Sequence, residues 1–149
     1  MMNVRIKPPH LYQAFMLCML AIYFLLPGTR LIDFPFNLVG LPVFAFGAYM
    51  ALAAKKSFLA SGTPMMPSAN PGRLHTDGWY RHTRNPMYLG VAIGLLGFAV
   101  LFSSYVNFLF PLLFVSLVDR WFIRAEEKFL AGVFGTQYQH YASRVRRWI

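Results

Sequence analysis

The residues best suited to chemistry lie in two short polar segments, each beside a long apolar run. The first runs from Gly78 to Gly90 and contains Arg81, His82, Arg84, several aromatic residues and Pro86. Charged residues next to apolar runs of membrane length are costly unless they lie at the interface or line a cavity. Pro86 suits the first position of a helix, where a missing N–H costs nothing. The segment therefore predicts a basic, aromatic ligand site at the start of a helix, where backbone N–H groups are free.

The second polar segment is Arg124-Ala125-Glu126-Glu127, at the end of the last apolar run. Adjacent residues on an α-helix point about 100° apart, so at most one of the two glutamates faces a given pocket. The simplest interpretation is a solvated helix on which Glu127 pairs with Arg124 at i,i+3. However, the chain has only five acidic residues. A carboxylate at this position could therefore hold a cation such as a sulfonium or an ammonium.

The composition indicates that these segments belong to a membrane protein. The chain is 57% hydrophobic and only 13% charged, with a mean hydropathy of +0.46, which is too apolar for an ordinary soluble domain. A net charge of +9 is more consistent with anionic lipid headgroups than with nucleic acid, because nucleic-acid binders do not usually carry several long apolar runs. Because the chain has a single cysteine, Cys18, it can form no intrachain disulfide, and the sequence suggests no metal cluster.

Four apolar runs predict an all-α integral membrane protein with about four transmembrane helices, formed by a single domain over residues 1–149. A cytoplasmic, cofactor-binding loop is expected at 55–85, where glycine and proline recur. A loop of this length in so small a protein is functional when it is ordered. The helices are expected at about 10–27, 36–54, 86–102 and 105–128, followed by a C-terminal helical segment over 129–149.

The distribution of charge predicts the orientation. Basic residues gather in the N-terminal lead, in the 55–85 loop and in the C-terminal segment, whereas the two opposite loops together carry one arginine and one aspartate. By the positive-inside rule, both termini and the long loop lie in the cytoplasm. We expect the chain in an inner (plasma) membrane.

Five motifs in the second half of the chain form an ordered set. They are Leu74-x-Thr76-x-Gly78-x-Tyr80, Arg84-Asn85-Pro86-Met87-Tyr88-x-Gly90, Glu126-Glu127-x-x-Leu130, Phe134-Gly135-x-x-Tyr138-x-x-Tyr141 and Val145-x-Arg147-Trp148. This set resembles the isoprenylcysteine carboxyl methyltransferase and phospholipid methyltransferase family, integral membrane enzymes that use S-adenosylmethionine. The first two helices match that family only as hydrophobic helices.

The resemblance implies that the motif before the third helix and the first glutamate of the pair bind the cofactor. The cofactor-binding candidates are Leu74, His75, Tyr80, Asn85, Pro86, Met87, Tyr88 and Glu126. The catalytic candidates are Glu126, Arg124 and Arg84, and no metal ligand is expected.

Two departures from the family pattern bear on the reaction. Many members have histidine at the position of Asn85, so we assign no proton transfer to this residue. The eukaryotic prenylcysteine enzymes carry a substrate-binding arginine where this chain has Phe122, although Arg120 or Arg124 could substitute. The acceptor is therefore left open between the carboxylate of a prenylcysteine-like compound and a lipid amine, methylated from S-adenosylmethionine at the cytoplasmic interface.

Two other functions remain open. One is a membrane reductase with a nicotinamide cofactor, although the chain has no GxGxxG pattern. The other is a non-catalytic lipid-binding membrane protein. The expected partners are membrane lipids and a lipophilic acceptor, without nucleic acid or metal.

Three residues have simpler structural interpretations. Asn85 precedes Pro86, so its side chain could cap the third helix. Arg146 and Arg147 are predicted to be headgroup and topology charges.

Overall fold

The computed structural model describes residues 8–26, 28, 30–60 and 73–149, and within these ranges it is helical and forms no β-strand. This confirms the all-α prediction. The elements are α1 (Pro8–Leu25), η2 (Phe36–Val39), α2 (Gly40–Ala60), η3 (Gly78–Arg81), α3 (Pro86–Phe102), η4 (Tyr105–Phe108), α4 (Leu109–Val118), η5 (Asp119–Ile123), α5 (Arg124–Phe134) and α6 (Thr136–Arg144).

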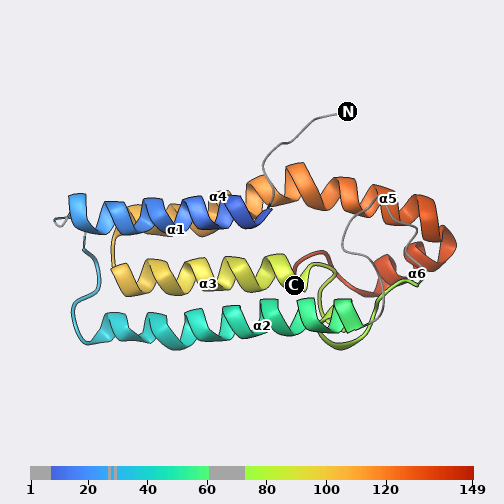
Figure 1. Cartoon of the computed structure of the whole chain (residues 1–149), viewed down its shortest axis with the longest axis horizontal. Coiled ribbons are helices and arrows are strands. Elements are labelled where there is room, and N and C mark those ends of the chain that lie inside the picture. The colour runs from blue at the N-terminus through green and yellow to red at the C-terminus, as the bar shows by residue number, and fades with distance from the viewer. Residues whose placement is uncertain (1–7, 27, 29, 61–72) are drawn as a thin grey trace.

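The helices α1, α2, α3 and α4 lie lengthwise beside one another, with α3 between α2 and the pair formed by α1 and α4 (Figure 1). At one end, the segments that follow α1 and α3 meet: the backbone N–H of Leu31 donates to the Ser103 carbonyl at 2.7 Å. At the opposite end, α5 extends the line of α4 and α6 folds back (Figure 1). The two polar segments identified in the sequence therefore lie at the same end.

Two helices run further than the sequence predicts. The second does not end at Ala54 but continues to Ala60, so Lys55 and Lys56 are helical rather than part of the loop. Lysine, leucine and alanine are good helix formers, so the added residues are compatible with a helix although they include charges. The fourth continues without a break from Tyr105 to Phe134. It crosses a short π-helical turn, η5, and ends before Gly135, whose φ is +51°.

Glycines allow α2 and α3 to pack with their backbones in contact. A Cβ on Gly90 would lie 2.6 Å from the backbone N of Ala51, and one on Gly97 would lie 2.7 Å from the carbonyl oxygen of Gly40. The obstructing atoms belong to the facing backbone and cannot rotate away. Small residues that let helices approach this closely are typical of packing in membranes.

We expect Gly97→Ala to destabilise the protein, because its methyl group has no free space between α2 and α3. Overpacking of this kind costs about 1–3 kcal/mol, or a melting temperature about 2–10 °C lower. Gly132→Ala in α5 is the matched control, because a Cβ there has no atom within 4 Å, and helix propensity alone should stabilise it by up to about 1 kcal/mol. Thermal unfolding in detergent measures both, and shifts of the same sign would contradict the packing described here.

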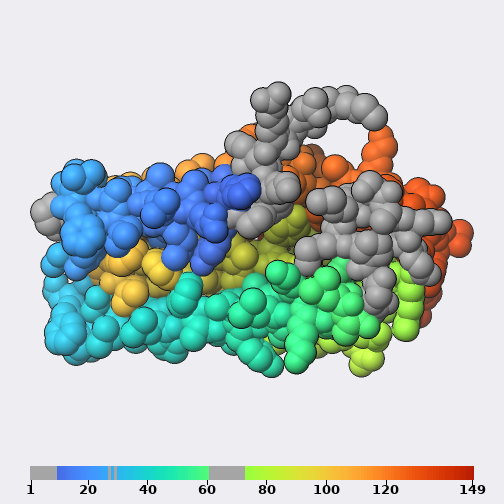
Figure 2. Space-filling model, in the orientation of Figure 1, coloured from blue at the N-terminus to red at the C-terminus, as the bar shows by residue number. Residues whose placement is uncertain are grey.

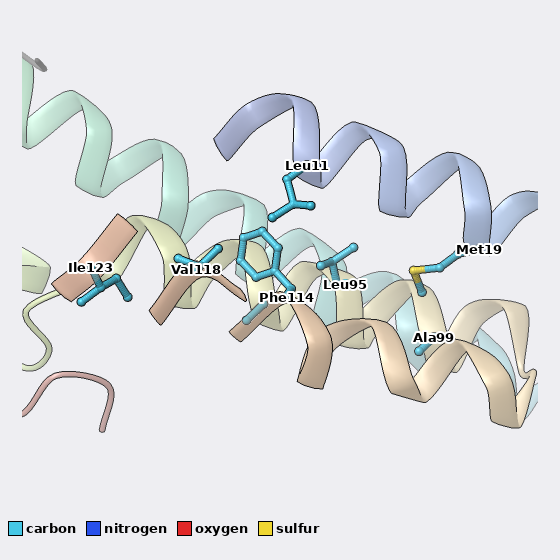
Figure 3. Close-up of a cluster of buried hydrophobic side chains, with 8 residues drawn as sticks. Leu11, Met19, Leu95, Ala99, Phe114, Val118 and Ile123 are labelled. Carbon is cyan, nitrogen blue, oxygen red and sulfur yellow. The ribbon is translucent and has the colours of Figure 1, made fainter. Parts of the chain in front are cut away.

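A hydrophobic core joins α1, α3, α4 and η5. Figure 3 shows buried side chains of this core, spread along the space between these four elements; the labelled ones are Leu11, Met19, Leu95, Ala99, Phe114, Val118 and Ile123. Trp148, near the C-terminus, packs against the same cluster.

Large apolar side chains also cover the outside of the molecule, where α1 and α2 form much of the surface seen in Figure 2. Leu17, Leu52 and Leu112 are 68%, 65% and 67% exposed. Two helices, over Phe36–Ala60 and Tyr105–Phe134, are long and apolar enough to cross a membrane, and His10–Leu25 and Pro86–Phe102 are shorter apolar helices. These features indicate a membrane protein. That all four helices cross the bilayer stays a prediction.

Candidate active site

A hydrogen bond joins the two polar segments. The Tyr88 hydroxyl, in the first turn of α3, donates to Glu126 Oε1, in the first turn of α5, at 2.8 Å. The two residues are 38 positions apart in the sequence. The structure therefore brings together the tyrosine of one predicted motif and the first glutamate of another.

Glu126 lies beyond the apolar part of its helix. The continuous helix over Tyr105–Phe134 has 30 residues. At about 1.5 Å per residue it is about 45 Å long, whereas a hydrocarbon core is about 30 Å thick. The helix is therefore longer than a single span needs, and the charged residues that begin α5, Glu126 among them, follow its apolar part.

The environment of Glu126 disfavours its charged form. Burial raises the pKa of the Glu126 carboxyl, the hydrogen bond from Tyr88 opposes this rise, and the negative charge of Glu127 adds to it. In the part of the chain that the structure describes, no arginine or lysine forms an ion pair with this carboxylate. A bound cation would compensate its charge.

Glu127 has the opposite environment. One of its carboxylate oxygens lies 2.9 Å from Arg84 Nη2, and the other lies 2.6 Å from Arg147 Nη2. The predicted pair between Glu127 and Arg124 is wrong, because Arg124 Nε binds Asp119 Oδ2 at 2.9 Å. The π-helical turn explains the difference, since it brings residues five positions apart into register. The adjacent glutamates thus differ: Glu127 is neutralised by two arginines and Glu126 by none among the described residues.

Aromatic residues lie beside Glu126. Tyr80 is buried, and its ring meets the His75 ring edge to face at 5.0 Å between centroids. Burial raises the pKa of the Tyr80 hydroxyl, and the charges of Tyr141 and Glu126 raise it further. Burial also lowers the pKa of His75, whose Nε2 shares a 3.0 Å hydrogen bond with Ser57 Oγ. Both groups are uncharged at neutral pH, so Tyr80 is a neutral aromatic neighbour of Glu126, and His75 packs behind it.

The other predicted site residues contact the C-terminal segment, are buried in the helix packing or are held in ion pairs. Asn85 does not cap α3, because its side-chain amide donates to the Arg147 carbonyl at 3.0 Å. Leu74 and Pro86 are buried and Met87 is half-buried. Arg84 and Arg124, predicted as catalytic, are held by Glu127 and Asp119. The structure therefore groups His75, Tyr80 and Tyr88 with Glu126, and groups Arg84 and Asn85 with the C-terminus.

An open hollow of 540 Å³ lies between the segment at Leu74–Arg81 and α6. It is bordered by Tyr141, whose hydroxyl donates to the Tyr80 carbonyl at 2.7 Å. A hollow of this volume can hold a small organic ligand. Among the described residues, no group of three His, Cys, Asp or Glu side chains could hold a metal ion.

Three residues of this region were missed or misread from the sequence. Ser57, which binds His75, falls where a loop was predicted, so its position on α2 was hidden. Asp119 and Arg147 were not expected to meet, yet Arg147 Nη1 lies 3.1 Å from Asp119 Oδ1. The available signal was the composition: with 14 lysine and arginine residues and only five acidic ones, a carboxylate near the basic segments could be expected to meet more than one basic side chain.

Comparison with known proteins decides the family. A sequence model described as phospholipid methyltransferase matches residues 35–137, well over half of the chain. The chain belongs to the phospholipid methyltransferase family. This confirms the resemblance seen in the motifs, and membership of the family indicates a methyltransferase.

Two relatives show how far the similarity to this family extends. A protein-S-isoprenylcysteine O-methyltransferase of Schizosaccharomyces pombe is 37% identical over 75 residues, which cover 48% of this chain and 30% of the yeast protein. An uncharacterized protein of Haemophilus influenzae is 30% identical over 63 residues, covering 42% of this chain and all of that protein. The match thus spans less than a third of the yeast enzyme's length. No solved structure matches the chain.

The match to the phospholipid methyltransferase family includes some parts of the site and leaves out others. It contains Tyr88, Glu126 and the two elements that carry them, α3 and α5. It ends at residue 137, before Arg147 and the extended C-terminal segment. The family match therefore gives no information on the C-terminal segment, and its contacts are seen in the structure alone.

Proposed function

We propose that this protein transfers a methyl group from S-adenosylmethionine to a lipophilic acceptor at the cytoplasmic face of a membrane. One observation carries the proposal: Glu126 is a half-buried carboxylate that accepts a hydrogen bond from Tyr88 and has no cationic partner among the described residues. A charge placed in this way costs free energy unless a ligand compensates it. S-adenosylmethionine carries two cationic groups, a sulfonium and an ammonium.

The residues around Glu126 fit such a ligand. Glu126 would hold one of the cationic groups, and Tyr88 would orient the carboxylate. The rings of Tyr80 and His75 offer apolar and π surface, which suits a purine or a sulfonium. When bound, the cofactor supplies an electrophilic methyl group.

The contribution of the protein to the reaction is mainly positioning. Methyl transfer requires the nucleophile, the methyl carbon and the sulfur to lie in line, and positioning alone can supply much of the acceleration. A carboxylate acceptor needs no base, whereas an amine acceptor must first lose a proton. Asn85 cannot take a proton, and Arg84 and Arg124 are held in ion pairs. This arrangement favours a carboxylate or an already neutral nucleophile, and we propose that both arginines position the site rather than react.

The acceptor would reach the site from the bilayer. The leucines of α1, α2 and α4 are exposed, so the apolar faces of these helices would lie against lipid in a bilayer. A lipophilic molecule could move along such a face to the end of the bundle that carries Glu126. The water-soluble cofactor and the lipid-soluble acceptor would then meet at the interface.

A methyl-transfer assay tests the proposed function. Purified protein in detergent is incubated with methyl-labelled S-adenosylmethionine and, separately, a prenylated N-acetylcysteine, phosphatidylethanolamine or a total lipid extract. Label that becomes volatile after treatment with base indicates a methyl ester, and label that resists base indicates an N-methyl product. We expect label in the lipid phase with at least one acceptor. Absence of transfer to any lipid fraction would contradict the proposal.

The proposed orientation can be tested separately. In a Cys18→Ala background, we expect Phe36→Cys to react with a membrane-impermeant maleimide in intact cells. Ser143→Cys should react only after permeabilisation, because it lies at the opposite end, on α6 (Figure 1). Both positions are exposed in the structure, so labelling of both from the same side would contradict the orientation.

A further inference from the structure

The extended segment that follows α6 returns to the start of α3. The backbone N–H of Arg84 donates to the Arg146 carbonyl at 2.9 Å. The Arg147 carbonyl accepts two further hydrogen bonds, from Thr83 Oγ1 at 3.1 Å and from Asn85 Nδ2 at 3.0 Å. The main chain at Arg147 is therefore fixed to the three residues that precede Pro86.

The side chain of Arg147 points to a different helix. Its Nε and Nη2 bind the two carboxylate oxygens of Glu127 at 3.1 Å and 2.6 Å, and its Nη1 binds Asp119 Oδ1 at 3.1 Å. A two-point contact between a guanidinium and a carboxylate fixes direction as well as distance. One residue thus contacts both the start of α3, through its main chain, and the η5–α5 junction, through its side chain.

These two regions carry the two partners of the site. Tyr88 lies three residues after Asn85, and Glu126 lies next to Glu127. We infer that Arg147 is a positioning residue, which ties α5 to the start of α3 and so sets the 2.8 Å contact between Tyr88 and Glu126. The part of this inference that concerns ligand binding rests on the proposed function. The connection that Arg147 makes between α5 and the start of α3 can be tested without a ligand.

Arg147 also influences the charge of Glu126 through Glu127. The negative charge of Glu127 raises the pKa of the Glu126 carboxyl, and the guanidinium of Arg147 partly cancels that charge. Without the Arg147 side chain, Arg84 would be the remaining basic partner of Glu127 in the described structure. The carboxyl of Glu126 would then take up a proton at a higher pH than in the parent.

The test compares Arg147→Gln, Arg147→Lys and Arg146→Gln. Arg146 is the matched control, because its exposed side chain makes one 3.4 Å hydrogen bond, to the main-chain O of Ile149, and forms no ion pair with an Asp or Glu side chain in the described structure. The affinity for S-adenosylhomocysteine is measured by calorimetry in detergent from pH 5 to pH 8. We expect Arg147→Gln to lose affinity at least fivefold at pH 7 and to shift the midpoint of its pH dependence upward. Arg147→Lys should keep the parent midpoint, because it retains the charge, and Arg146→Gln should match the parent throughout.

A second measurement needs no ligand. Tyr88→Phe, Glu126→Ala and the double variant, which remove one or both partners of the 2.8 Å contact, are compared by thermal unfolding, with Arg147 intact and with Arg147→Gln. We expect a non-additive shift in melting temperature with Arg147 intact and a clearly smaller one in Arg147→Gln, because among the described residues only the Arg84–Glu127 ion pair then ties α5 to the start of α3.

The outcomes separate the two proposals. Non-additivity of the same size in Arg147→Gln, or a pH midpoint that stays at the parent value, would overturn the positioning role while leaving the proposed function intact. If the parent does not bind S-adenosylhomocysteine at all, the proposed function fails, and the thermal comparison still decides whether Arg147 sets the contact.

Discussion

Glu127→Gln should lower the melting temperature of the protein by about 5–10 °C. This carboxylate is only 16% exposed and binds both Arg84 and Arg147. Removal of one partner from a buried ion pair costs about 3–5 kcal/mol. Because the Arg147 side chain is 35% exposed, water screens part of this loss, so we expect about 2–3 kcal/mol. The sequence indicated only Arg124 as a partner for Glu127, on a solvated helix, and an exposed pair of that kind would contribute about 0–1 kcal/mol.

Asp77→Asn is the matched control for this stability prediction. Asp77 also contacts two arginines, Arg73 and Arg81, but at 3.5 Å and 3.4 Å and with side chains that are about half exposed or more. Exposed pairs of this kind contribute about 0–1 kcal/mol. Thermal unfolding should therefore show a small shift for Asp77→Asn, and equal shifts for both variants would argue against a buried ion cluster at Glu127.

Glu126→Gln should have the opposite profile, with weaker cofactor binding and little change in stability. Glutamine has nearly the same shape and can still accept the hydrogen bond from Tyr88, but it carries no charge. Loss of a charge-assisted contact of about 1.5–3 kcal/mol corresponds to an affinity about tenfold to a hundredfold lower. Calorimetry with S-adenosylhomocysteine measures this affinity, and the melting temperature without ligand reports the stability.

The same variant shows which cationic group Glu126 contacts. S-adenosylmethionine has both a sulfonium and an ammonium, whereas S-adenosylhomocysteine has only the ammonium. If Glu126→Gln reduces both affinities equally, the carboxylate contacts the ammonium. If it reduces mainly the affinity for S-adenosylmethionine, the carboxylate contacts the sulfonium. Unchanged affinity for both ligands would remove Glu126 from the site.

The helical membrane fold could be predicted because long apolar runs leave few alternatives. The start of the third helix at Pro86 followed from the position of the proline itself, and the structure confirms it. The end of the second helix could not be predicted, because Lys55 and Lys56 suit an interface loop as well as a helix that continues past the apolar core. Helix propensities differ too little among such residues to decide.

The site could be predicted only in part. The motifs that contain Tyr88 and Glu126 identified two residues that are in contact, although no local pattern links positions 38 residues apart. The partners of Glu127 were not predictable, because the π-helical turn at Asp119–Ile123 redirects Arg124 to Asp119. Arg147 was misread as a topology charge because its role depends on how the C-terminal segment folds back.

Calorimetric titration of S-adenosylhomocysteine and NADPH into the parent protein and Tyr88→Ala tests the central claim most directly. The cofactor is proposed to bind beside the Tyr88–Glu126 pair, so the parent should bind S-adenosylhomocysteine and not NADPH. Tyr88→Ala should lose most of this affinity, and Tyr88→Phe, which keeps the ring, should lose less. If Tyr88→Ala binds S-adenosylhomocysteine as tightly as the parent, or if the parent binds NADPH instead, the site does not lie at this pair.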